Sequence, residues 1–232
     1  MTTTSRHIAK LLCVPCAIAL VALPHAALAQ SPAPPGGGAL AGDPSAPVLT
    51  AAPGALLGHT LHVRGTVAGA GGRLVRVERF DSVAGAWSAV TRVRAAADGS
   101  FVAAWKTDTL GAATLRAVPD DSAQVQASSA APVARVTVYR PVVATWYGGP
   151  TMLGNGVACG GHLTRATLGV ANRTLPCGTK VQLLYHGRTI TVPVIDRGPY
   201  GSNASYDLTQ ATSDQLGMTS AGRATIGVLP QR

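Results

Sequence analysis

Residues 180–200 read KVQLLYHGRTITVPVIDRGPY and indicate a β-hairpin that ends at an acidic turn. Apolar side chains recur along Lys180–Tyr185 and Thr189–Ile195, which predicts two strands. The His186-Gly187 pair between them suits a tight hairpin turn. Asp196 directly follows the second strand and opens a Gly-Pro turn, so we expect its side chain at the mouth of that strand.

The sequence around this hairpin indicates a small barrel over residues 141–232. One helix is predicted at Thr209–Leu216, because a threonine cap precedes it and Gly217 stops it. About ninety residues of mostly β structure with one short helix are typical of a closed barrel. Further strands are predicted at Val142–Tyr147, Thr167–Ala171 and Ala224–Leu229.

Residues 48–140 indicate a separate β domain. Apolar and polar residues alternate in Thr60–Val67 and Leu74–Phe80, and Asp98-Gly99 marks one of the turns between such segments. Six or more strands at this spacing predict an antiparallel β-sandwich. Through Trp87–Val90, Asp98-Gly99 and Trp105 the segment resembles bacterial immunoglobulin-like domains, and this resemblance implies only a fold.

The first 29 residues have the three parts of a secretory signal peptide. A basic start precedes the apolar stretch Leu11–Leu23, and the small-residue site Ala27-Leu28-Ala29 predicts cleavage before Gln30. Residues 30–47, QSPAPPGGGALAGDPSAP, are typical of a flexible linker. We therefore expect a secreted protein of the periplasm or cell wall, with no membrane anchor after cleavage.

Cleavage leaves two cysteines in the mature chain, Cys159 and Cys177. In an exported protein such a pair predicts one disulfide. No further thiol or histidine pair accompanies them at metal-ligand spacing, so neither a metal nor a cofactor is expected.

The net charge of +9 is spread along the chain. A basic exported protein is attracted to anionic wall polymers, which are candidate partners, although dispersed arginines also serve solubility. Nucleic acid is not an expected partner, because no basic-aromatic motif is present. The chain contains a single glutamate, Glu78, so chemistry that needs two carboxylates must rely on aspartates.

Several stretches of the barrel region carry a family signature in order and spacing: ATWYG at 144–148, ACG at 158–160, ANRTLPCGTKV at 171–181, VIDRGPY at 194–200 and YDLT at 206–209. Together they resemble the rare lipoprotein A family of double-psi β-barrels, whose relatives include expansins and barwin-like proteins. The resemblance implies a six-stranded barrel with a groove for peptidoglycan glycan strands, and it matches the disulfide-bearing subgroup.

In catalytic members of this family the implied activity is lytic transglycosylation, which forms a 1,6-anhydro end without consuming water. One carboxyl group can serve as acid and then as base, provided that its pKa is raised. The barrel region offers Asp196, Asp207 and Asp214, of which Asp214 is expected to be exposed on the helix. Asp196 is the predicted acid/base and Asp207 its partner. The alternative role for Asp196 is structural, in which it accepts hydrogen bonds from the N–H groups of its turn. The alternative role for Asp207 is to cap the helix that follows.

The sequence departs from the family pattern at two positions. The family glutamate and histidine fall on Gly161 and Asn172, neither of which transfers a proton. Three hypotheses therefore stay open: a lytic transglycosylase that uses Asp196, a non-catalytic wall-binding or wall-loosening module, and a secreted protein-binding or inhibitor module. Further candidates for substrate contact are Thr145, Tyr147, Asn172, Arg197 and Tyr200.

Overall fold

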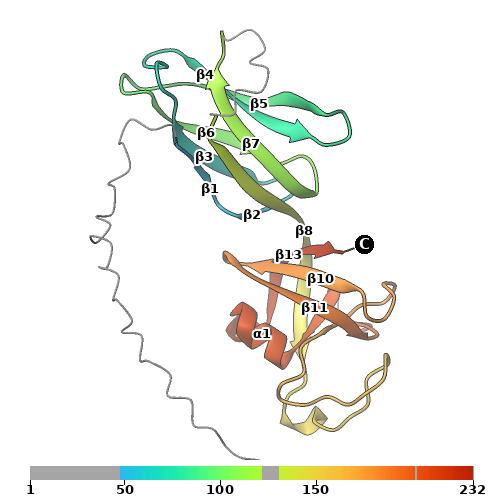
Figure 1. Ribbon diagram of the computed structural model, residues 1–232. Helices are drawn as coiled ribbons and strands as arrows, with labels where there is room; N and C mark the ends of the chain where they lie inside the picture. The colour runs from blue at the N-terminus through green and yellow to red at the C-terminus, as the bar shows by residue number, and fades with distance from the viewer. Residues whose placement is uncertain (1–47, 122–130, 202, 232) are drawn as a thin grey trace, which may run out of the picture. The chain divides into compact units, whose positions relative to one another are not determined.

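The computed structural model describes residues 48–121, 131–201 and 203–231 (Figure 1). The signal peptide and linker predicted for residues 1–47 lie outside these ranges. Within the described ranges, no helix is long and apolar enough to cross a membrane.

The N-terminal half consists of two β-sheets around one apolar core. One sheet has the strand order β1-β3-β6, and the other runs β5-β4-β7-β8 with β2 beside β8. Alternating side chains such as Val63, Val77 and Leu115 are fully buried between the sheets. The immunoglobulin-like identity of this part stays a prediction. Its strands are β1 (Val48–Ala51), β2 (Gly54–Leu56), β3 (Thr60–Thr66), β4 (Leu74–Asp81), β5 (Ala86–Arg94), β6 (Ser100–Lys106), β7 (Gly111–Pro119) and β8 (Val133–Tyr147).

Strand β8 is continuous where the sequence predicts a domain boundary at Pro141. Its first half pairs with β7 and β2, and its second half pairs with β13 and β12. Alternation correctly predicts strand structure on both sides of Pro141, but the chain does not turn between them. The proline is accommodated opposite Gly227, where a side chain would collide with Tyr139.

The second half of β8 and five further strands form a closed barrel, which confirms the predicted six-stranded double-psi fold. The strand order is β12-β9-β11-β10-β13-β8, and β12 also pairs with β8, which closes the ring. Val181, Leu183, Leu208 and Ile226 fill its interior. The added strands are β9 (Val170–Ala171), β10 (Lys180–Tyr185), β11 (Arg188–Asp196), β12 (Tyr206–Thr209) and β13 (Arg223–Pro230).

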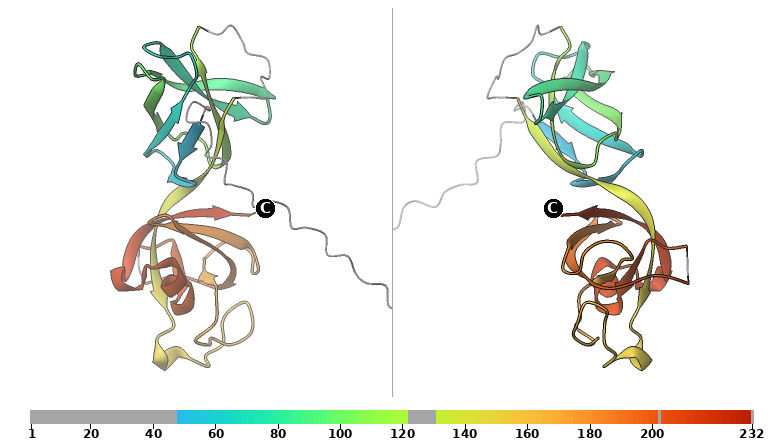
Figure 2. Two further views of the ribbon diagram at one scale, coloured as in Figure 1. Left: turned by 60° about the vertical axis from the view of Figure 1, so that its left-hand side comes forward. Right: turned by 90° about the vertical axis from the view of Figure 1, so that its right-hand side faces the viewer.

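The predicted hairpin and helix are present. His186 and Gly187 have positive φ angles of 46° and 80° between the paired residues Tyr185 and Arg188, as a two-residue hairpin requires. The helix α1 (Gln210–Leu216) lies beside β11 (Figures 1 and 2). It begins at Thr209, whose side chain accepts a hydrogen bond from the Thr212 N–H, and it ends at Gly217 in the left-handed conformation.

The structure corrects the alternative hypothesis for Asp207. This residue lies inside β12, a strand that the sequence did not predict, and the helix cap is Thr209. Asp207 is therefore not a capping residue, and its side chain is available to the barrel surface.

Candidate active site

A cleft of about 450 Å³ opens on the barrel, within the size range of small-ligand sites. Six of the seven candidate side chains from the sequence line it, and Asn172 does not. The lining residues are Thr145, Tyr147, Met152, Ala171, Asp196, Arg197, Gly198, Pro199, Tyr200, Gly201 and Asp207.

The short strand β9 brings the two aspartates to this cleft. Ala171 on β9 is the register partner of Asp196 on β11 and also of Asp207 on β12. Paired residues on neighbouring strands share a sheet face, so the two aspartates flank Ala171 with roughly 10 Å between their backbones. The small alanine side chain leaves the space between them open.

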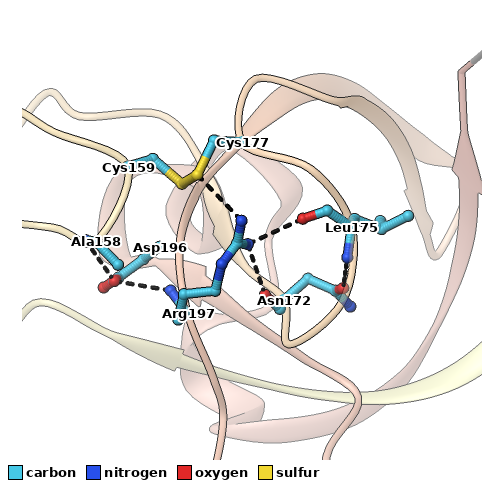
Figure 3. The surroundings of a disulfide bond; sticks show 7 residues. All are labelled: Ala158, Cys159, Asn172, Leu175, Cys177, Asp196 and Arg197. Carbon is cyan, nitrogen blue, oxygen red and sulfur yellow. Dashed lines mark hydrogen bonds between the residues drawn. A yellow bond between two sulfur atoms is a disulfide. The ribbon is translucent and has the colours of Figure 1, made fainter.

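Asp196 is held in place by its own loop. Its Oδ1 accepts hydrogen bonds from the backbone N–H of Ala158 at 2.9 Å and of Arg197 at 2.8 Å (Figure 3). Both of these bonds go to the same oxygen, and the half-buried side chain still lines the cleft. Asp196 can therefore hold its loop and line the cleft at the same time.

Asp207 is a half-buried carboxyl group of the cleft. Burial raises its pKa, and the negative charge of Asp196 raises it further. A hydrogen bond from the Thr145 hydroxyl to Asp207 Oδ1, 2.7 Å long, acts in the opposite direction. This contact follows from the register of the parallel pair β8 and β12, in which Thr145 lies opposite Asp207.

Tyr147 lies two residues along β8 from Thr145, on the same side of the strand. Burial raises the pKa of its phenol, and the charge of Asp196, a side-chain hydrogen bond to Asp196 and the charge of Asp207 raise it further. The hydroxyl oxygen is buried beside the Asp196 carboxylate. The phenol therefore stays neutral beside two carboxyl groups.

Arg197 has internal partners instead of an open guanidinium group. Its Nη1 donates to the carbonyl oxygens of Asn172 at 3.0 Å and Leu175 at 2.9 Å, and its Nη2 contacts Cys177 Sγ at 3.1 Å (Figure 3). Arg197 lines the cleft, but these contacts stabilise the loop that carries Asn172 and Cys177.

Asn172 is also occupied within the protein, and only 8% of its surface is exposed. Its Oδ1 accepts from the backbone N–H of Leu175, and its Nδ2 donates to the carbonyl oxygen of Ser205. The sequence suggested substrate contact at this position because the family resemblance places a histidine there. The hydrogen bonds instead indicate that Asn172 shapes its own loop.

The predicted disulfide between Cys159 and Cys177 is present. Cys159 follows Ala158, one of the two donors to Asp196, and its own N–H donates to the carbonyl oxygen of Ile195. The disulfide therefore links the segment around Ala158, which donates to Asp196, to the loop that Arg197 stabilises.

Gly161, at the family's glutamate position, has a φ of +86° and no atom of another residue close to where a Cβ would lie. A side chain there is disfavoured by the backbone conformation, although space is available. The neighbouring His162 is exposed and is not among the cleft-lining residues.

Fold and cleft define a double-psi β-barrel domain with a carboxylate-lined site, and residues 141–228 match the family model described as "Lytic transglycolase". The C-terminal domain is specifically an RlpA-like barrel. It resembles "Endolytic peptidoglycan transglycosylase RlpA" of Campylobacter jejuni at 36% identity over 86 residues, which are 36% of this chain and 31% of the relative. A "Probable endolytic peptidoglycan transglycosylase RlpA" of Aquifex aeolicus is 40% identical over 81 residues, 34% of this chain and 35% of the relative.

The chain thus spans about a third of the length of these relatives. Among solved structures, the "Streptomyces papain inhibitor (SPI)" is 28% identical with a TM-score of 0.31, and the match covers 38% of this chain and 92% of the inhibitor.

Removal of the disulfide should destabilise the protein. Closing a loop of this length contributes about 3 kcal/mol in the chain-entropy model. A Cys159→Ser/Cys177→Ser double variant should therefore have a Tm lower by at least several degrees in a thermal melt. A reducing agent should lower the Tm of the wild type and leave that of the double variant unchanged. Two free thiols in the native protein would contradict the prediction.

Asp207→Asn should stabilise the protein at neutral pH. A carboxyl group whose pKa is raised by folding costs stability as pH rises from its ordinary value through the folded-state value, because the unfolded chain releases the proton more readily. The Tm of the variant should exceed that of the wild type at pH 7. The difference should vanish as pH falls below the ordinary value of 3.8, where both states carry the proton. The exposed helix residue offers a control, because Asp214→Asn removes the same charge without relieving burial; equal gains from both variants would contradict the prediction.

Proposed function

We propose that the barrel binds a peptidoglycan glycan strand in the cleft and cleaves it as a lytic transglycosylase of the cell envelope. The observation that carries this proposal is the placement of two aspartates around Ala171, one of them with a raised pKa. The RlpA relatives support peptidoglycan as the substrate. The basic net charge of +9 favours association with an anionic wall.

The proposed reaction divides acid and base between the two carboxyl groups. Asp207 passes its proton to the glycosidic oxygen between the MurNAc and GlcNAc units, and the bond from that oxygen to C1 breaks. The C6 hydroxyl oxygen of the same MurNAc unit bonds to C1, and its proton passes to Asp196. The products are a shortened strand and a 1,6-anhydro end, and the proton then returns from Asp196 to Asp207 through solvent.

This division differs from the sequence hypothesis, in which Asp196 serves as both acid and base. The general acid must carry a proton when it acts, and burial moves the pKa of Asp207 in that direction. Asp196 accepts two backbone hydrogen bonds on one oxygen, an arrangement suited to a fixed carboxylate that receives a proton on the other.

A non-catalytic wall-binding module is the second candidate. The glycine at 161 provides no side chain and the amide of Asn172 is occupied by its loop, so neither family position offers a proton carrier. In this alternative the same cleft holds a glycan strand without cleaving it, as the resemblance to expansins suggests.

The test is digestion of purified sacculi, both intact and stripped of stem peptides, followed by mass spectrometry for 1,6-anhydro products. The wild type should form them, and Asp196→Asn and Asp207→Asn should each lower their rate by at least about a hundredfold. Asp214→Asn, which removes the same charge outside the cleft, should behave as the wild type.

The variants separate the hypotheses. Partial activity in Asp207→Asn with none in Asp196→Asn would favour Asp196 as the single acid and base. Sedimentation of the wild type with sacculi without any anhydro product would favour the binding module. Full activity in Asp196→Asn would contradict both catalytic assignments.

The pH profile provides an independent test of Asp207 as the proton donor. The hydrogen bond from Thr145 lowers the pKa of Asp207, so Thr145→Val should let that pKa rise. The alkaline limb of kcat/KM, where the donor loses its proton, should then move to higher pH. A shift to lower pH would exclude Asp207 as the acid.

A further inference from the structure

Five arginines lie on the outer face of the sheet formed by β5, β4, β7 and β8 in the N-terminal half (Figure 1). Residues paired across neighbouring strands share a sheet face, and the alternate residues of these strands point into the apolar core. The pairs that place the arginines together are Arg76 with Arg92, Leu74 with Arg94, Glu78 with Arg116, and Thr114 with Arg135. We call the following set the arginine face: Arg76, Arg92, Arg94, Arg116 and Arg135.

Three guanidinium groups of the arginine face share two carboxylates. Glu78 accepts hydrogen bonds from Arg76 and Arg116, each 2.7 Å long. Asp120 accepts from Arg76 at 3.1 Å and from Arg92 at 2.9 Å. Three positive charges against two negative charges leave this network with one positive charge that has no countercharge.

Much of this network is removed from water. The side chains of Glu78 and Arg116 are 7% and 9% exposed, and that of Arg76 is 16% exposed. A buried ion pair adds little net stability, because desolvation offsets the attraction, and a buried charge without a countercharge costs stability. The neighbouring acidic group, Asp121, is paired with Arg73. The fold therefore keeps a cationic group here that an added anion would neutralise.

Aromatic and apolar side chains adjoin the network. The guanidinium carbon of Arg116 lies 4.3 Å from the centre of the Trp87 ring, and the rings of Trp87 and Phe80 are 5.2 Å apart between centres. Phe80, Leu74 and Val133, all on the same face, are exposed. Guanidinium groups pair with carboxylates and phosphates, and aromatic rings pack against the apolar side of a ligand. Together they complement a sugar unit that carries an anionic group.

We propose that the arginine face binds an anionic polysaccharide. The exposed Arg92 and Arg94 lie on the edge strand β5 and the exposed Arg135 lies on β8, so positive charge extends across four strands, roughly 14 Å at the usual strand spacing. A linear polyanion contacts such a row at several points, whereas a small anion contacts it at one. This site uses no residue of the cleft, and it does not depend on the proposed function.

The test measures the Kd of the whole protein for polygalacturonate, which carries carboxylates, for phosphomannan, which carries phosphates, and for neutral dextran. The wild type should bind at least one acidic polysaccharide and not dextran, and salt should weaken this binding. The tighter acidic probe identifies the anionic group. Arg135→Gln and Arg92→Gln should each raise the Kd about five- to tenfold at low ionic strength.

Arg64→Gln is the matched control, because it removes the same charge from an exposed position on β3 in the other sheet. Its Kd should equal that of the wild type. Arg135 forms no ion pair within the described ranges, so Arg135→Gln should keep the wild-type Tm in a thermal melt even if Arg92→Gln, which loses its bond to Asp120, does not.

Four results would overturn the proposal. They are no binding of the wild type to either acidic polysaccharide, equal affinity for dextran or duplex DNA, an unchanged Kd in Arg135→Gln, and an equal loss in Arg64→Gln, which would make net charge alone responsible. Asp207→Asn lies in the cleft and should leave this Kd unchanged. Loss of anhydro-product formation and loss of acidic polysaccharide binding are therefore separate results, and either proposal can fail while the other stands.

Discussion

Strand β12 pairs with β8 on one side and with β9 on the other, and this double pairing both closes the barrel and assembles the cleft. The β8 register sets Thr145 opposite Asp207, and the β9 register sets Ala171 between Asp207 and Asp196. A slip of one residue in β12 would turn Asp207 toward the apolar interior and Leu208 toward the cleft. Because Leu208 is fully buried in the core, packing of the barrel enforces the geometry of the site.

The cleft concentrates groups that oppose folding, and the loops around it supply compensation. Asp207 is a desolvated carboxyl group, and Tyr147 carries a buried hydroxyl beside two carboxyl groups. Next to them, Arg197 ties two backbone carbonyls together and the disulfide joins the 159 and 177 segments. Rigidity from these links lets the cleft hold unfavourable polar groups in fixed positions, as preorganised sites require.

Local sequence patterns predict the strands and the helix whose formation depends on residues close together in the chain. Alternation finds the strands of the β10–β11 hairpin, and the threonine and glycine at the ends of α1 identify the helix. The strand β12 was missed because its four residues, the last of which is the helix cap Thr209, carry too little periodicity to indicate a strand. The internal partners of Arg197 depend on the path of the 172–177 loop, which no periodicity encodes. Six of the seven predicted site residues nevertheless line the cleft, since both the strand pattern and the family motifs pointed to this part of the barrel.

Because Gly161 and Asn172 carry no acidic or imidazole side chain, the proposed proton transfer rests on the two aspartates of the cleft. In that proposal one carboxyl group gives a proton and the other accepts one, and the two candidates lie on β11 and β12. Gly161 and Asn172 lie in loops outside these strands: Gly161 is exposed, and Asn172 forms hydrogen bonds within its own loop. Asp207 lies beside Thr145 because of the pairing between β8 and β12, whereas Asp196 is fixed by backbone N–H groups of the neighbouring loops.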